Sequence, residues 1–269
     1  MTYATPIGGL PTQEAKLTGK AVFTTAYAVI PGGVMRDIVT SYLPFWEKSR
    51  AWVLARPLSG FAETFSQYIV EIKPSGGSNN PEPDNQVESI IFVTSGSLII
   101  NHGSGDQEML PGGYAYCPPG VSYVIKNTGT KNTTIHLFRK RYISVEGILA
   151  PKPFTTNEKD IKPTVMDHSK GAWSTTRFVD PEDLRYDMHV NIVNFKPGGV
   201  IPFEETHVME HGIYILEGSA EYLLNKDWVH VEAGDFLWLR AFCPQACQNT
   251  GSGNFRYLLY KDVNRHAKL

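Results

Sequence analysis

An internal repeat constrains the fold of this 269-residue chain more than any other feature. Residues 91–130 and 213–252 align without a gap at an offset of 122 positions. Four pairs of turn residues coincide in that alignment: Gly96 with Gly218, Gly112 with Gly234, Asn127 with Asn249 and Gly129 with Gly251. Single glycine matches are common, but four matches in one register, with apolar stretches between them, predict two copies of one structural unit.

Short runs of apolar, aromatic and β-branched residues fill both copies. Examples are "SQYIVEI", "SIIFVT", "IYILEG", "DFLWL" and "RYLLY". Short turn-forming segments such as "PGG", "PPG", "AGD" and "NTGSG" separate them. This alternation predicts an all-β fold of the sandwich or barrel type. Residues 151–175 are polar and contain proline, which predicts a linker between an N-terminal domain over 1–150 and a C-terminal domain over 176–269.

Composition excludes several classes of protein. A formal net charge of -2 argues against nucleic-acid binding, and the short basic cluster at 139–141 is better explained as strand-end charge. No apolar run approaches the ~18 residues of a membrane span, and the N-terminus lacks the pattern of a secretory signal. Three cysteines cannot all pair, which favours a reducing compartment such as the cytoplasm. We therefore expect a small-molecule partner rather than nucleic acid or a membrane.

The stretch "EETHVMEHGIYILEG" concentrates polar residues in front of an apolar run. Side chains of a strand alternate between faces, so Glu205, His207 and His211 share one face if the segment is extended, and Ile213 and Ile215 continue that face inward. One interpretation is a metal site. The alternative is a rim of salt-bridged His and Glu at the mouth of a barrel, and we favour ligation because of the spacing and the repeat.

The repeated pattern resembles the two-part motif of cupins, which are small antiparallel jelly-roll barrels. A block ending in glycine, a Gly-Asp-type turn and a proline-led strand ending in asparagine carry this resemblance. It implies two tandem cupin domains and a divalent metal held in the second by Glu205, His207, His211 and Gln245. The same offset lands on Pro83, Asn85, Ser89 and Tyr123 in the first domain. These residues make a poor metal site, so we expect the first domain to lack a metal.

The set implied for the second domain contains one carboxylate oxygen, two imidazole nitrogens and one amide oxygen. Such a mixed set suits Mn, Fe, Co, Ni or Zn, and the absence of a thiolate disfavours a structural zinc site. Cys243 and Cys247 share strand parity with Gln245, so a soft-metal site built on them is an alternative. Buried, unreactive cysteine is the interpretation that we favour.

Nearly the whole chain resembles the (S)-ureidoglycine aminohydrolases. The resemblance rests on "MHVNIVNFKPGGVIPFEETHVMEHGIYILEGSAEYLLN", "GDFLWLRAFCPQACQNTG" and "YLLYKDVNR", and on "PGGYAYCPPG" and "RKRYISVEG" in the first half. Members of that family act in purine and allantoin breakdown, where they replace the α-amino group of (S)-ureidoglycine by hydroxyl and release ammonia and (S)-ureidoglycolate. The resemblance implies Mn²⁺ as the metal. It also implies that Tyr222, Tyr257 and Lys261 line the substrate pocket. Glu205, or a tyrosine hydroxyl, is a candidate proton carrier between water and the leaving amine, so the expected catalytic set is Glu205, Tyr222, Tyr257 and Lys261. Cupins often pack into dimers or rings, so we expect a homo-oligomer.

Three of these residues can be considered without the family. Tyr257 and Lys261 share parity on the last long strand, and a lysine inside a barrel is costly unless it meets a negative charge such as a substrate carboxylate. Alternatively, Lys261 extends to water from the strand's end. Tyr222 and Tyr257 could equally be amphipathic wall residues.

Three other functions fit a bicupin with one metal site. A cupin dioxygenase would use Fe²⁺ or Cu²⁺ and consume O₂, and a cupin isomerase acting on a sugar or keto acid would release no ammonia. A non-catalytic bicupin would bind a ligand without turnover. The asymmetry between the halves favours catalysis, because a binding or storage protein has less reason to keep a full ligand set in one half only.

Overall fold

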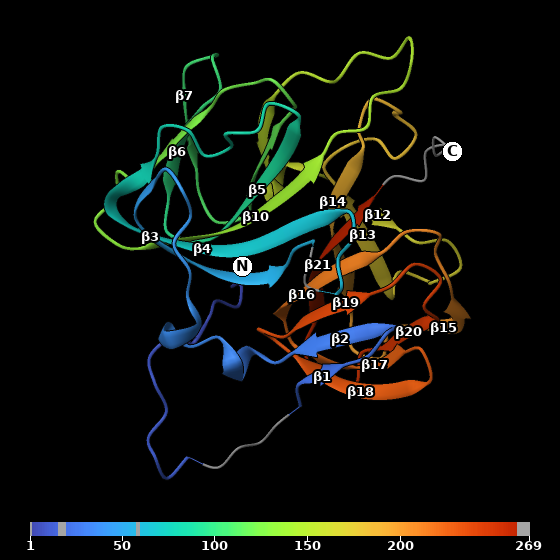
Figure 1. Ribbon diagram of the computed structural model, residues 1–269. Helices are drawn as coiled ribbons and strands as arrows, with labels where there is room; N and C mark the ends of the chain where they lie inside the picture. The colour runs from blue at the N-terminus through green and yellow to red at the C-terminus, as the bar shows by residue number, and fades with distance from the viewer. Residues whose placement is uncertain (1, 16–19, 58–59, 263–269) are drawn as a thin grey trace.

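The computed structural model describes residues 2–15, 20–57 and 60–262, and nearly all of its regular structure is β-strand. Within these ranges the helical segments are three short 3₁₀ turns, η1 (Gly32–Val34), η2 (Asp37–Val39) and η3 (Glu158–Asp160). No helix in the described part of the chain has the length and apolarity needed to cross a membrane. The predicted all-β class is therefore confirmed. Figure 1 shows two β-units side by side, the first coloured mostly blue to green and the second orange to red.

A nine-stranded sheet forms the N-terminal unit, with all of its pairs antiparallel. Its strand order is β11-β8-β5-β10-β4-β9-β6-β7, and β3 pairs with β4. The bounds are β3 (Trp46–Ala55), β4 (Phe65–Ser78), β5 (Val87–Ser95), β6 (Leu98–Asn101), β7 (Asp106–Met109), β8 (Gly113–Cys117), β9 (Val124–Lys126), β10 (Thr133–Arg141) and β11 (Phe154–Asn157). Alternate residues such as Ile91, Val93 and Leu137 fill its interior, as strand periodicity requires.

The C-terminal unit consists of an eight-stranded sheet, β1-β2-β19-β16-β21-β14-β13-β12, and a four-stranded sheet, β15-β20-β17-β18. The bounds are β1 (Val22–Phe23), β2 (Tyr27–Ile30), β12 (Thr164–Val165), β13 (Trp173–Arg177), β14 (Met188–Phe195), β15 (Val200–Glu205), β16 (His211–Glu217), β17 (Ser219–Leu224), β18 (Asp227–Glu232), β19 (Phe236–Leu239), β20 (Gln245–Gln248) and β21 (Phe255–Asp262). Residues of both sheets share one buried apolar cluster, so the two sheets enclose a barrel-like interior.

The repeat predicted from the sequence is visible in matching turns. Asn127 Nδ2 donates to the Ile72 carbonyl at 2.9 Å, and Asn249 Nδ2 donates to the Phe195 carbonyl at 3.2 Å. Gly96 and Gly218 have φ of +75° and +78°, and a Cβ on either would lie within 2.7 Å or less of a carbonyl oxygen, that of residue 132 or of residue 254. Both positions therefore require glycine for the same two reasons, a left-handed backbone and a close approach.

The pairing of strands departs from the predicted boundaries at 150 and 175. β2 belongs to the C-terminal sheet, where it pairs with β19, and Figure 1 shows this blue strand among the orange ones. β11 lies in the predicted linker but pairs with β8, and β12 pairs with β13. These strands are short additions at sheet edges, where a polar or proline-containing segment can form backbone hydrogen bonds without an apolar pattern. For that reason the sequence of 151–175 looked like a connector.

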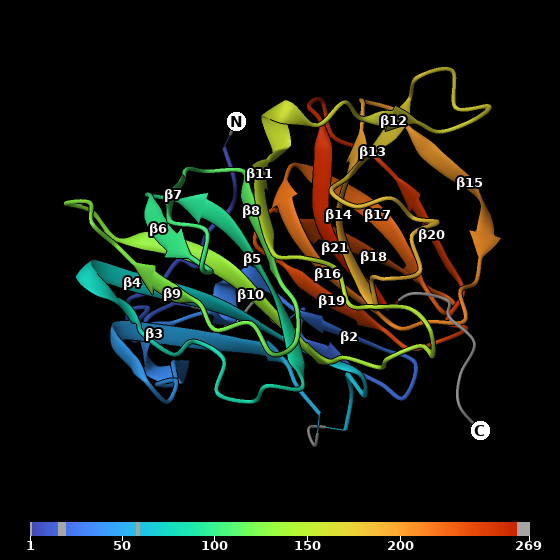
Figure 2. The same cartoon turned by 90° about the horizontal axis from the view of Figure 1, so that it is seen from above.

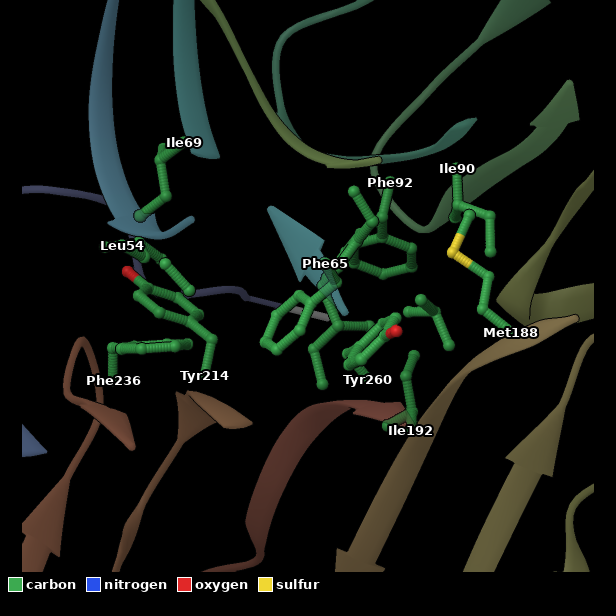
Figure 3. Packing of buried hydrophobic residues seen from close by; sticks show 14 of the residues in the cluster. Leu54, Phe65, Ile69, Ile90, Phe92, Met188, Ile192, Tyr214, Phe236 and Tyr260 are labelled. Atoms are coloured by element: carbon green, nitrogen blue, oxygen red, sulfur yellow. The ribbon is translucent and has the colours of Figure 1, made fainter. Parts of the chain in front are cut away.

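A third apolar cluster joins the two units. It includes Leu54, Phe65 and Phe92 from the N-terminal sheet and Tyr214 and Tyr260 from the C-terminal sheet (Figure 3). Phe65 and Tyr260 stack with ring centroids 3.8 Å apart. Viewed from above, the two units pack along this shared layer (Figure 2). The layer fixes the outer faces of β16 and β21, so the opposite faces of the same strands are held rigidly toward the interior of the C-terminal barrel.

Candidate metal and substrate site

The interior of the C-terminal barrel contains a cavity of about 210 Å³. All the residues predicted to form the site line this cavity: Glu205, His207, His211, Tyr222, Gln245, Tyr257 and Lys261. They come from β15, β16, β17, β20, β21 and the loop between β15 and β16. The structure therefore brings the predicted residues together, while their individual roles remain predictions.

Glu205, His207 and His211 do not lie on one continuous extended strand, as we had expected. β15 ends at Glu205, β16 begins at His211, and His207 lies in the intervening loop. The pairing of β15 with β20 is irregular between Ile201 and Glu205, and after that shift Glu205 faces Gln245 across the sheet. The common orientation toward the cavity thus comes from a break in the strand, not from simple alternation. Ile213 and Ile215 are buried in the barrel, as predicted.

The distances within the set are compatible with a divalent ion. Glu205 Oε2 and His207 Nε2 are 3.2 Å apart, and the ring centroids of His207 and His211 are 5.0 Å apart. Two donors about 2.1 Å from an ion and at right angles to each other lie about 3 Å apart. In the described part of the chain no three His, Cys, Asp or Glu side chains form a metal cluster by themselves. Glu205, His207 and His211 are therefore not grouped closely enough in the described structure to hold an ion by themselves, and the ligand set that adds Gln245 to them stays a prediction.

His211 has the properties of a metal ligand. It is buried, and its Nδ1 has no hydrogen-bond partner among the described residues, which is costly unless a ligand compensates. Burial, then the neighbouring His207 and Lys261, lower its pKa to about 3. The imidazole is therefore neutral at physiological pH, which is the form that binds metals.

The two tyrosines of the site remain protonated. Burial is the main cause that raises the pKa of both Tyr222 and Tyr257 well above the ordinary value. Tyr222 Oη donates to Gln245 Oε1 at 3.0 Å, and the Tyr222 and Tyr257 rings meet edge to face at 6.1 Å. Both hydroxyls are therefore hydrogen-bond donors at neutral pH. Both border the same polar cavity, where a substrate-binding residue and an amphipathic wall residue would equally lie, so the choice between these two roles stays a prediction.

Lys261 borders the cavity and is partly exposed. Burial, followed by the nearby charge of Arg177, lowers its pKa. The cysteines have a different environment. Cys243 and Cys247 belong to the buried apolar cluster, and burial raises the pKa of both thiols, as expected for unreactive cysteines.

In the N-terminal barrel the positions equivalent to the predicted metal-binding set have different surroundings. Ser89 and Tyr123 are buried, and Pro83 lines a cavity of only about 100 Å³ whose lining is mostly apolar. Arg139, which lies 122 positions before Lys261, is neutralised inside the protein by Glu82, with Nη2 and Oε1 2.7 Å apart. The first barrel therefore supplies its own counter-ion at the position where the second barrel presents a lysine to the cavity.

Sequence analysis missed one wall of the cavity. β13 contributes Trp173, Thr175 and Arg177, and β14 contributes Asn191 and Val193. The sequence feature that could have indicated this wall is the strand alternation in "WSTTR" and "HVNIV", in which every second residue faces the cavity. It was overlooked because β13 straddles the predicted end of the linker.

Comparisons with known proteins define the class first. The cupin domain family matches residues 191–260, and the EutQ-like cupin domain family matches residues 59–142. Oxalate decarboxylase from Bacillus subtilis has the same fold, with a TM-score of 0.63 and 11% identity over 85% of this chain and 76% of that chain. The protein is therefore a bicupin, as predicted.

Closer relatives define the family. (S)-Ureidoglycine aminohydrolase of Escherichia coli is 31% identical over 89% of this chain and 88% of its own, and that of Arabidopsis thaliana is 30% identical over 85% and 74%. A crystal structure from Pseudomonas aeruginosa, provisionally titled a glyoxylate-induced protein, is 62% identical with a TM-score of 0.94 over 100% of this chain and 98% of that one. The chain belongs to the (S)-ureidoglycine aminohydrolase family.

Proposed function

We propose that this protein hydrolyses (S)-ureidoglycine to (S)-ureidoglycolate and ammonia. The observation that carries the proposal is that Glu205, His207, His211, Gln245 and the three residues Tyr222, Tyr257 and Lys261 line one cavity in a chain of this family. The cavity is small, about 210 Å³, and it presents both acceptors and donors. A compact polar substrate suits such a space.

We further propose that Mn²⁺ binds to Glu205, His207, His211 and Gln245. A divalent ion at this position supplies a Lewis acid beside the substrate. Lys261 provides a positive charge for the substrate carboxylate, and the protonated Tyr222 and Tyr257 hydroxyls orient polar groups by donation. Because both hydroxyls hold their protons strongly, Glu205 is the better candidate to accept a proton from water.

The test uses freshly prepared (S)-ureidoglycine with Mn²⁺, and it follows ammonia release and the handedness of the product. The substrate decays spontaneously, so the rate without enzyme must be subtracted. We expect His211→Ala to lose bound metal and turnover together. His230→Ala is the matched control, because His230 is exposed and pairs with Glu221 on the outer surface. A His211→Ala protein with full activity in the absence of manganese would refute the scheme.

We also propose a cytoplasmic homo-oligomer. All three cysteines are free and buried, which suits a reducing compartment. The apolar residues Ile38, Tyr42 and Phe45 are 78%, 87% and 62% exposed, and a second copy of the chain could cover them. Light scattering of the purified protein tests the oligomer, and a monomeric mass at micromolar concentration would contradict it.

A further inference from the structure

The β13 wall of the cavity carries two polar side chains, Thr175 and Arg177, for which no hydrogen bond is found within the described part of the chain. Thr175 is 8% exposed, and its Oγ1 has no hydrogen-bond partner among the described residues. Arg177 lies two positions further along β13, on the same face, and also borders the cavity. A buried hydroxyl and a guanidinium that face the same space are costly to leave unpaired, so this wall is built to meet a ligand.

Arg177 and Lys261 both border this side of the cavity, and neither has an ion pair with a described residue. Arg177 pairs in register with Asn191 on β14, and Lys261 on β21 pairs with His189, so the two cations approach from either side of β14. The charge of Arg177 contributes to lowering the pKa of Lys261. In the described ranges neither side chain has a hydrogen bond or ion pair to the protein. The carboxylate of Glu205 is engaged instead with His207, at 3.2 Å.

The first barrel shows what happens at the equivalent position when no ligand is needed. There Arg139 takes the place of Lys261, and Glu82 neutralises it internally. The second barrel has neither this glutamate contact nor a substitute among its described residues, and it adds a second cation. An anion from outside is the natural partner, because it removes the repulsion between Arg177 and Lys261 and is held by both.

We infer that Arg177 is a substrate-binding residue that holds the carboxylate of the substrate jointly with Lys261. This inference rests on the proposed function for the identity of the substrate but not for the presence of an anion site. A planar guanidinium can hold a carboxylate through two parallel hydrogen bonds, whereas lysine acts as a point charge. Together they fix the orientation of the carboxylate, and the Thr175 hydroxyl is available to a neighbouring polar group of the same ligand.

The main test compares Arg177→Met and Arg177→Lys with the wild type in steady-state hydrolysis of (S)-ureidoglycine. We expect Arg177→Met to raise KM about tenfold or more while kcat changes much less. The KM of Arg177→Lys should lie between those of Arg177→Met and the wild type, because lysine keeps the charge but cannot form the two parallel hydrogen bonds of a guanidinium. Lys126→Met, which removes an exposed charge from the N-terminal sheet, is the matched control and should leave KM unchanged. An unchanged KM in Arg177→Met would overturn the inference.

Thermal unfolding separates a binding role from a structural one. Because Arg177 has no ion pair within the described protein and faces Lys261, its replacement by Met should leave Tm equal or slightly higher. A lower Tm would mean that Arg177 has a structural partner and would also overturn the inference.

Binding of (S)-ureidoglycolate by calorimetry tests the anion site independently of turnover. We expect at least about tenfold weaker binding to Arg177→Met than to the wild type. If the wild type releases no ammonia but binds this carboxylate in an Arg177-dependent way, the proposed function fails and the anion site stands. If ammonia is released and Arg177→Met binds as well as the wild type, the function stands and the inference fails.

Discussion

The hydroxyl of Tyr222 donates a hydrogen bond to the side-chain oxygen of Gln245 at 3.0 Å. Gln245 is the neutral member of the candidate metal-binding set, and the amide alone could rotate to present nitrogen instead of oxygen. The donor at Tyr222 favours the orientation in which oxygen is held within the cavity, because an NH₂ group at that position would face another donor. The relation therefore links a predicted substrate-pocket residue to the metal site.

This contact predicts the effect of Tyr222→Phe. The variant should bind Mn²⁺ about 10- to 100-fold more weakly, because groups that orient a ligand typically have effects of this size. A metal titration of the purified variant, combined with ammonia release at saturating Mn²⁺, measures both consequences. Tyr214→Phe is the matched control, since the Tyr214 hydroxyl is buried with no hydrogen-bond partner among the described residues and the ring belongs to the cluster between the units. Equal metal affinity in Tyr222→Phe and the control would refute this role.

Glu210 is predicted to be a structural residue although it stands beside His211. Its Oε1 accepts from the Thr64 amide and hydroxyl, both at 2.6 Å, and its Oε2 accepts from Glu63 N at 3.1 Å and Trp238 Nε1 at 2.8 Å. Glu210→Ala leaves several donors unpaired and should lower the free energy of unfolding by about 3 kcal/mol. Urea denaturation measures this change in the free energy of unfolding. The partly exposed Glu221 offers a control, because replacing it by Ala should lower the free energy of unfolding by less than about 0.5 kcal/mol.

Asp262 is predicted to make stability depend on pH. The pKa of this carboxyl is raised from 3.8 to about 6, and burial is the largest cause of the rise. Asp262 Oδ1 has no hydrogen-bond partner among the described residues. The unfolded chain releases this proton more readily, so the contribution of Asp262 to stability falls as pH rises from about 4 to about 6. Asp262→Asn should therefore be about 2 kcal/mol more stable than the wild type at pH 7, with no gain at pH 3.

Urea unfolding at both pH values gives this difference directly. Asp167→Asn changes an exposed carboxyl and should have no effect at either pH. A gain at pH 3 equal to the gain at pH 7 would show that ionisation of Asp262 is not the cause.

A fragment of residues 151–269 is predicted not to fold by itself. Without β2, the edge of β19 is unpaired, and the hydrogen bond from Tyr27 Oη to Asp227 Oδ2 at 2.8 Å is lost. The faces of β16 and β21 that pack against Phe65 would also be exposed to water. Circular dichroism on heating should show no cooperative transition, in contrast to the full chain. A sharp transition in the fragment would support the predicted boundary at 150 as a true domain limit.

The family resemblance, not a local pattern, assigned Gln245 and the substrate-pocket residues to the site. The all-β class, the two-copy repeat and the cluster of Glu205, His207 and His211 could be predicted from the residues alone. These features are local or repeated: turn glycines at a fixed offset, strands of period two, and His and Glu at a short spacing. Each one depends on backbone geometry that neighbouring residues already specify. The conserved geometry of Asn127 and Asn249 shows how closely the two copies follow the same local rules.

Which polar residues lie together at the site depends on the tertiary fold. Glu205 and Glu210 are both close to the histidines in sequence, but only Glu205 lines the cavity. The carboxylate of Glu210 instead accepts hydrogen bonds from residues 63, 64 and 238. Arg177 reaches the cavity through the pairing of β13 with β14. β2 pairs with β19, and the paired residues Ile30 and Phe236 are 206 positions apart in the sequence. Strand pairing over such separations is set by the burial of whole faces and the closing of sheet edges, and a local pattern of residues does not encode it.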